Sequence, residues 1–170
     1  IQLKRIRPDF IIKHIRGNID TRVKKLRKKE FDAIVLAYAG LKRLSLLSSC
    51  QAIDPRIIFP ALGQGAIALV VNKKNKTVNN VIKQLNHYKT YIETECERSF
   101  LRALDGSCKT PVGGYAVIKK TGSQEKIFFN YRAFSDNGMV SNQNRVVFNL
   151  KNFRSESFDL GVEVKKKIAN

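Results

Sequence analysis

Apolar side chains recur at helical spacing in the second half of the chain. Ile92, Cys96, Phe100 and Leu104 lie at steps of four, which places them on one face of a helix. The spacing predicts a helix over residues 90–106. We expect Gly106 to end it, because glycine takes the left-handed conformation of a helix terminus at no steric cost.

Short apolar runs flank an amphipathic stretch in the first part of the chain. Residues 10–15 (FIIKHI) and 32–37 (DAIVLA) have the length and the branched side chains of buried parallel strands. Between them, TRVKKLRKK is typical of a helix, with Asp20 as its expected N-cap. A further helix is expected over residues 40–47. Strand, crossover helix and strand form a βαβ unit, so the pattern predicts an α/β lobe.

The rest of the chain is predicted to hold a connecting segment and a small α+β domain. Residues 67–71 read as an apolar strand and residues 76–85 as an amphipathic helix. After Pro111, strands are expected over 115–118, 126–134 and 139–150, separated by the turn sequences TGSQ and SDNG. A last helix over 155–169 is expected to pack Phe158, Val162 and Ile168 on this sheet.

Composition excludes several classes of protein. The chain has 170 residues, 43% of them hydrophobic, which is ordinary for a globular protein with a core. No apolar run reaches the ~18 residues of a membrane span, and none near the N-terminus has signal-peptide length. The first residue is Ile1, so we expect the chain to begin inside a longer protein. Three cysteines without CxxC spacing favour neither a disulfide framework nor a zinc site, and they indicate a reducing compartment.

The formal net charge of +18 indicates either an anionic partner or a solvated basic surface. Lysines occur in scattered pairs and triplets among asparagines, as in VNKKNKTVNN, which favours the solvated surface. The chain has no tryptophan and no RNP, zinc-finger or basic-zipper pattern. Nucleic-acid binding is therefore kept as an alternative only.

Candidate binding residues stand at the ends of the two predicted strands. Arg16 follows the first strand, Arg22 lies in the first turn of the next helix, and Arg43 follows the second strand. Ligands of open α/β sheets bind at this edge, and arginine pairs with carboxylates through two parallel hydrogen bonds. A cation at a helix N-terminus opposes the helix dipole, so Arg22 is better explained by a bound anion. A small-anion binding module of the periplasmic type would use the same edge, and a merely solvated basic face is the remaining alternative.

A second candidate is Cys108, which lies in a short loop between Gly106 and Pro111. The nearby cations Arg102 and Lys109 favour the thiolate, so the cysteine could be a nucleophile. The structural alternative is a small buried hydrophobic side chain.

Three stretches of this sequence resemble the porphobilinogen deaminase (hydroxymethylbilane synthase) family. They read ERSFLRALDGSCKTPVG around Cys108, RPDF…RGNIDTRVKKL…FDAIVLAYAGLKRL in the first part, and PALGQGA at 60–66. Ser107 stands where many members have a second glycine, and Asp105 where many have glutamate. The resemblance covers nearly the whole chain.

The resemblance implies a three-domain architecture of which this chain supplies a part. Residues 1–59 would be most of domain 2, a lobe like those of periplasmic binding proteins. Residues 60–86 would be a returning segment of domain 1, and residues 87–170 the third domain with the cofactor cysteine. The fold class is thus α/β plus α+β. The general acid/base aspartate of the family would lie in the missing part of domain 1, so this chain by itself is expected to be inactive.

The resemblance also implies the ligands and the residues that hold them. A dipyrromethane cofactor would be attached to Cys108 through a thioether. Porphobilinogen would be condensed in four rounds, with loss of ammonia, into the linear tetrapyrrole hydroxymethylbilane. The residues implied at the cofactor are Cys108, Arg22, Gly40, Gln64 and Gly65. Those implied at the substrate and the growing chain are Arg16, Arg22, Arg43, Leu36 and Ala37.

The partners expected from the resemblance are few. They are porphobilinogen, the growing polypyrrole and the missing portion of domain 1, in an enzyme that is monomeric when complete. No metal, nucleic acid or membrane is expected to take part. The compartment would be the cytoplasm or a plastid-type organelle, both reducing.

Overall fold

The structure is a computed structural model, and it describes residues 1–106 and 110–169. The chain forms two compact units, Gln2–Ile57 and Ile58–Asn170, the latter together with Ile1. The division into residues 1–59, 60–86 and 87–170 stays a prediction.

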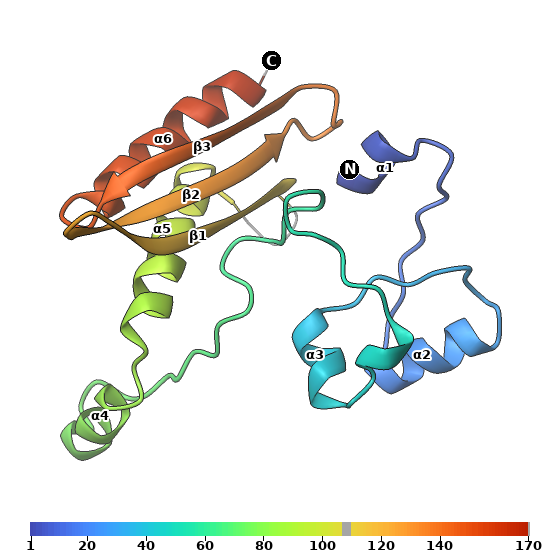
Figure 1. Cartoon of the computed structure of the whole chain (residues 1–170), viewed down its shortest axis with the longest axis horizontal. Coiled ribbons are helices and arrows are strands. Elements are labelled where there is room, and N and C mark those ends of the chain that lie inside the picture. Colours follow the sequence, from blue (N-terminus) through green and yellow to red (C-terminus); the bar gives the residue numbers. More distant parts are fainter. Residues whose placement is uncertain (107–109, 170) are drawn as a thin grey trace. The chain divides into compact units, whose positions relative to one another are not determined.

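The second unit is built on a three-stranded antiparallel sheet, as the sequence predicts. The strands follow each other in the order β1 (Val112–Thr121), β2 (Gln124–Phe134) and β3 (Ser141–Asn149). In their register Ala116 lies opposite Phe129, and Phe129 lies opposite Val146. Two long helices, α5 (Tyr88–Ala103) and α6 (Phe153–Ile168), cover one face of this sheet (Figure 1).

The core between sheet and helices confirms the apolar stripe predicted for α5. Ile92, Cys96, Phe100 and Leu104 are all buried, and Phe100 is 0% exposed. The Phe100 ring meets Phe129 at 5.1 Å between centroids, in an edge-on arrangement of the kind that aromatic pairs prefer.

Truncating this ring is expected to destabilise the unit strongly. Phe100→Ala should lower the free energy of unfolding by about 3–5 kcal/mol, because it removes a fully buried ring and leaves a cavity. Denaturant unfolding of the chain would measure this loss. Phe158→Ala is the control, because the Phe158 side chain is 43% exposed and should cost less than about 1 kcal/mol. Similar losses for both variants would contradict the assignment of the core.

The inward face of α6 differs from the prediction. Phe158 points to solvent, while Val162 and Ile168 are partly buried. The buried positions of the helix are Phe153, Ser157, Gly161 and Val164. Small residues stand here because α5 and α6 approach closely: a Cβ at Gly161 would lie 2.6 Å from the Ala103 Cβ atom. The sequence prediction followed the large side chains and missed this contact.

The end of α5 also differs from the prediction. The helix ends at Ala103, and Asp105, not Gly106, takes the left-handed conformation, with φ of 51°. The Gly106 N–H donates to the Leu101 carbonyl at 2.9 Å, and the Asp105 N–H to the Arg102 carbonyl at 3.1 Å. This is a Schellman motif. Glycine is needed at 106 because a Cβ there would overlap the Leu101 side chain.

The first unit is helical where helices were expected and irregular where strands were expected. Its elements are α1 (Gln2–Ile6), α2 (Ile19–Arg27), α3 (Tyr38–Arg43) and the 3-10 turn η1 (Leu47–Ser49). The N-cap of α2 is Asn18 and not Asp20: the Asn18 side chain accepts a hydrogen bond from the Thr21 N–H at 2.9 Å. Asp20 lies in the first turn, where its charge suits the helix dipole.

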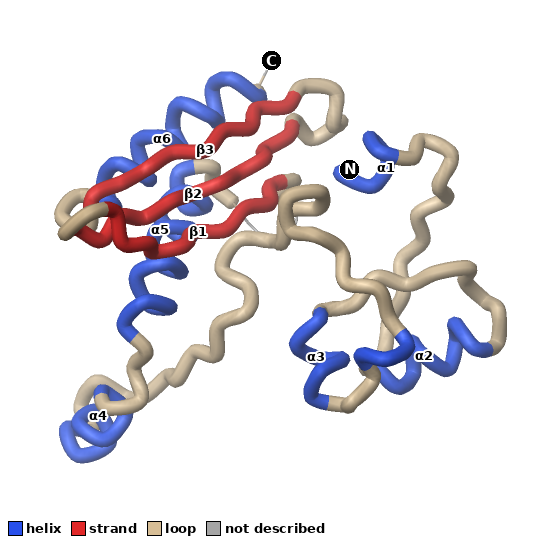
Figure 2. The backbone as a smooth tube through the Cα atoms, viewed as in Figure 1, coloured by secondary structure: helices blue, strands red, loops and turns tan. Residues whose placement is uncertain are grey.

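The strands predicted over 10–15, 32–37 and 67–71 do not form in this chain, and Figure 2 draws these segments as loop. A strand exists only when a neighbour accepts and donates its backbone hydrogen bonds. Here the apolar side chains are left in solvent: Ile11 is 82% exposed and Val70 is 92% exposed. The predicted α/β lobe is therefore not seen.

The predicted amphipathic helix over 76–85 does form, as α4 (Lys76–Lys83), capped by the Asn75 side chain. Its apolar residues Val78 and Val81 are also exposed, as is Leu85, which follows the end of the helix.

Candidate functional site

The described residues on both sides of Cys108 are held by neighbouring elements. Cys108 itself, like its neighbours 107 and 109, lies outside the described residues. On one side stands the Schellman motif of α5, where Asp105 forms an ion pair with Lys165 of α6. On the other side Val112 begins β1, and the Pro111 carbonyl accepts a hydrogen bond from the Phe134 N–H at 2.9 Å. The chain thus enters and leaves this loop from fixed elements.

The free edge of β1, next to the loop, is capped by other parts of the unit. The N–H of Gly114 donates to the Pro60 carbonyl, and the N–H groups of Ala116 and Ile118 donate to the carboxylates of Glu97 and Glu93, each at 2.8 Å. Four residues of a helix rise about 6 Å and two residues of a strand about 6.7 Å. Carboxylates spaced i, i+4 on α5 therefore match donors spaced i, i+2 on β1.

The segment PALGQG lies along the same edge. Leu62 is buried over Gly114, where a Cβ would come within 2.9 Å of the Leu62 Cδ2 atom. Gly63 and Gly65 take φ values of 70° and 85°, which only glycine adopts without strain. The predicted cofactor contacts Gln64 and Gly65 therefore stand on a tight turn beside the start of β1.

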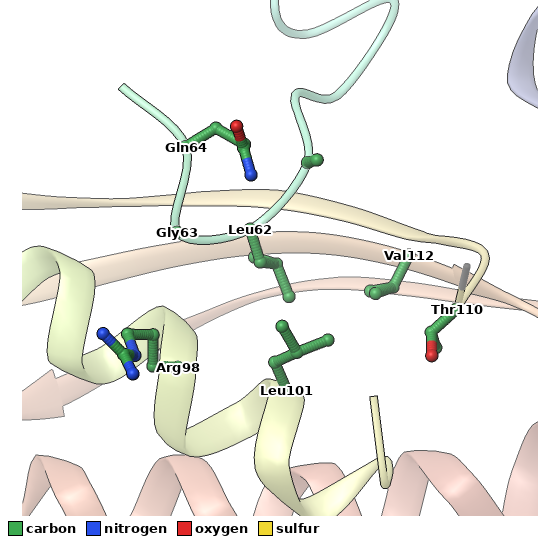
Figure 3. Close-up of a pocket in the computed structure, with 8 residues that line it drawn as sticks. Leu62, Gly63, Gln64, Arg98, Leu101, Thr110 and Val112 are labelled. Atoms are coloured by element: carbon green, nitrogen blue, oxygen red, sulfur yellow. The ribbon is translucent and has the colours of Figure 1, made fainter. Parts of the chain in front are cut away.

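A cavity of about 270 Å³ opens between this turn, α5 and the start of β1 (Figure 3). Leu62, Leu101 and Val112 supply its apolar wall. Its lining is Ala61, Leu62, Gly63, Gln64, Arg98, Leu101, Thr110 and Val112. The cavity thus touches both the turn with Gln64 and the residue that follows the cysteine loop.

Arg98 is the cation of this cavity, and the sequence analysis did not single it out. It is exposed, and no hydrogen bond or ion pair to the described residues holds its guanidinium. The signal in the sequence that could have indicated Arg98 is its position directly after Glu97 in the motif ERSFLRALDGSC.

The predicted arginine rim belongs to the first unit. Arg16 and Arg43 are exposed, and Arg22 is half-buried. The Arg22 Nε donates a hydrogen bond to the Gly17 carbonyl at 2.7 Å. This bond within the chain also helps to explain why an arginine stands in the first turn of α2. The terminal nitrogens make no other hydrogen bond within the described chain.

The helices that carry Arg22 and Arg43 approach each other at one point. A Cβ at Gly40 would lie 2.6 Å from the Ile19 Cδ1 atom, so α3 approaches the start of α2 closely at this point. Gly40 therefore has a packing role in the structure. Leu36 is half-buried and Ala37 is the exposed N-cap of α3. Arg43 and Arg22 are thus carried by helices that contact each other.

The two described cysteines have different surroundings. Cys96 is fully buried, and burial raises the pKa of its thiol to about 12, against the opposing effect of a hydrogen bond with Ser157. Cys50 is exposed, and its thiol donates to the Leu47 carbonyl at 3.3 Å. The Cys96 thiol is therefore unreactive in the folded chain.

The described residues contain no group of three or more His, Cys, Asp or Glu side chains placed to hold a metal ion. Over the same residues, no helix has the length and the apolar character needed to cross a membrane.

Comparison with known proteins gives matches over nearly the whole chain. Residues 1–80 match the family model described as "Porphobilinogen deaminase, dipyromethane cofactor binding domain". Residues 91–170 match the model described as "Porphobilinogen deaminase, C-terminal domain".

Curated relatives carry the same name. A porphobilinogen deaminase of Lawsonia intracellularis is 41% identical over 166 residues, which are 97% of this chain and 52% of the relative. That of Rickettsia prowazekii is 45% identical over 116 residues, covering 67% of this chain and 39% of the relative. That of Listeria monocytogenes (strain ATCC BAA-679 / EGD-e) is 44% identical over 120 residues, covering 68% and 39%. The chain thus spans about half of the first relative's length and less of the other two.

Proposed function

Because the chain belongs to the porphobilinogen deaminase family, we propose that it is the cofactor-holding part of a transferase that builds hydroxymethylbilane from porphobilinogen. The observation that supports the proposal is that Gly106 and Pro111, on either side of Cys108, are held by hydrogen bonds, and that the cavity at the Gln64 turn reaches Thr110. The described residues that flank the proposed attachment site thus lie near the two proposed cofactor contacts, Gln64 and Gly65.

The described residues fit a dipyrromethane attached at Cys108. Cys96 is excluded by its burial, and the cavity that reaches Thr110 combines an apolar wall with a cation, Arg98, among the described residues. A pyrrole ring with acidic side chains needs both features. When bound, the cofactor supplies the nucleophilic carbon to which pyrrole units are added, and ammonia leaves from each porphobilinogen.

The chain's own residues bind and orient the acidic groups. Each pyrrole unit brings two carboxylates, so the growing product adds negative charge in one place and needs fixed cations. Arg16, Arg22 and Arg43 fill this role, with Leu36 and Ala37 beside the substrate. Arg22, Gly40, Gln64 and Gly65 face the cofactor.

A complementary portion of the enzyme would complete the first unit. The extended apolar segments 10–15 and 32–37 have no strand partner among the described residues, and the chain spans 52% of the Lawsonia relative. Strands supplied by the missing portion would pair with these segments and close a lobe of the periplasmic-binding-protein type. The same portion would supply the acid/base aspartate, so the chain by itself is inactive and the completed enzyme is a monomer.

The proposal is tested by completing the enzyme. The chain should be produced together with a polypeptide that supplies the missing portion, and ammonia release and linear tetrapyrrole should be measured after porphobilinogen is added. We expect bilane formation by the pair and none by either part, because the cofactor site and the aspartate lie on different parts.

Nucleic-acid binding, the alternative suggested by the charge, is tested beside it. Any affinity for a labelled oligonucleotide should fall by a factor of roughly 10³ between 50 and 200 mM salt if six or more phosphates are contacted, while bilane formation persists. Salt-tolerant, sequence-selective oligonucleotide binding without bilane would contradict the proposed function.

A further inference from the structure

Glu97 joins three segments that are far apart in the sequence. Its side chain projects from α5, is 8% exposed, and has both carboxylate oxygens occupied. One oxygen accepts the Ala116 N–H of β1 at 2.8 Å, and the other accepts the Gly63 N–H at 2.7 Å. Burial raises the pKa of this carboxyl group, and the two N–H donors act in the opposite direction.

We propose that Glu97 is a positioning residue, which fixes the turn Gly63–Gly65 beside the cavity and so sets the place of the Gln64 side chain. The inference rests on the proposed function, in which Gln64 faces the cofactor. Glu97 would then act in the reaction as well as holding the free edge of β1.

The turn depends on Glu97 because little else holds it. Both glycines have left-handed φ values, and a glycine backbone has more conformations to lose than any other. Pro60 and Leu62, which precede the turn, are held by Gly114 and by burial over it. From Gly63 to Gly65, the bond to Glu97 is the one hydrogen bond made with the described residues.

The geometry supplies a matched control one turn earlier on the same helix. Glu93 accepts the Ile118 N–H of β1 at 2.8 Å, which is the same kind of bond at the same sheet edge. It makes no hydrogen bond to the turn Gly63–Gly65. Glu93 makes one such bond, which the oxygen of a glutamine can keep, so Glu93→Gln removes the carboxylate charge and leaves the turn in place.

The test compares Glu97→Gln with Glu93→Gln. A glutamine amide has one oxygen, so it can keep only one of the two N–H partners of Glu97 while its NH₂ group opposes the other. We expect it to keep Ala116, which the pairing of β1 holds in place, and to lose Gly63, whose turn has no other hydrogen bond to the described residues. In the 170-residue chain, hydrogen exchange should accelerate at the Gly63 amide about ten- to hundredfold in E97Q and stay unchanged there in E93Q. This readout does not depend on enzymatic activity.

In the completed holoenzyme the two variants should separate in kcat. We expect E97Q to lower kcat tenfold or more, with KM within about threefold of the parent and with the same cofactor content by intact mass. E93Q should stay within about threefold in both constants. If E97Q fails to fold, Glu97→Asp and Glu93→Asp replace the pair, because Asp keeps the charge but is too short to reach both donors.

The outcomes distinguish the inference from the proposed function. Two results would overturn the positioning role while the parent enzyme still forms bilane. One is hydrogen exchange at Gly63 that is unchanged in E97Q. The other is faster exchange at Gly63 in E97Q together with a kcat equal to that of E93Q. A parent holoenzyme that forms no bilane would instead overturn the proposed function, and with it the role assigned to Glu97.

Discussion

Replacing Cys108 with serine is expected to abolish bilane formation and to remove the covalent adduct from the completed enzyme. A thioether needs a thiolate, and a serine hydroxyl is a far weaker nucleophile at neutral pH. Intact mass should exceed the sequence mass by the two-ring cofactor in the parent protein and equal the sequence mass in Cys108→Ser. Fragmentation of the adduct should place it on Cys108.

The other cysteines provide the controls for this result. Cys50→Ser should keep both adduct and activity, because Cys50 is an exposed thiol outside any loop framed by glycine and proline. The Cys96 thiol is buried, and the pKa of about 12 leaves it protonated at neutral pH. An adduct on Cys50 or Cys96, or an active holoenzyme without any adduct, would overturn the assignment.

The sequence predicts the second unit well because its pattern is local. The stripe on α5, the turn signals between the strands and the amphipathic pattern of α4 each depend on residues within a few positions of one another. The stripe Ile92, Cys96, Phe100 and Leu104 is buried as predicted. The end of the same helix shows the limit: Gly106 is required by a contact with Leu101 and not by its own dihedral angle.

The errors arise where the outcome depends on a distant partner. The runs 10–15 and 32–37 have the composition of strands, but no neighbouring strand is present among the described residues. Phe158 was assigned to the core for its size, whereas the close crossing of α5 and α6 selects Ser157 and Gly161. Such contacts leave no periodic signal in the sequence.

The candidate site shows the same division. The segments around Cys108 and at Gln64 and Gly65 could be found through the resemblance to a known family. The task of Glu97 could not, because its partners Gly63 and Ala116 are 34 and 19 positions away. The Arg22 bond to Gly17 also changes the prediction, since a cation in the first turn of α2 no longer requires an anion to explain it. Its role in binding substrate stays a prediction.

The arginine rim should have the second largest effect on catalysis. Replacing Arg16, Arg22 or Arg43 with leucine in the completed enzyme removes hydrogen bonds to a carboxylate, worth roughly 1.5–3 kcal/mol each. We expect each variant to lose about ten- to hundredfold in kcat/KM, since 1.36 kcal/mol corresponds to a factor of ten. Steady-state kinetics with porphobilinogen would measure this loss.

Three comparisons decide whether the rim or diffuse charge binds the substrate. Lys28 and Lys166 are exposed, and their leucine variants should change kcat/KM by less than about twofold. Arg22→Lys keeps the charge but loses the planar fork that pairs with a carboxylate, so it should resemble Arg22→Leu more than the parent. Because the Arg22 side chain also donates a hydrogen bond to Gly17, the thermal stability of the Arg22 variants must be measured beside their kinetics. Equal losses from the lysine and the arginine variants would mean that overall positive charge, and not a fixed set of arginines, attracts the substrate.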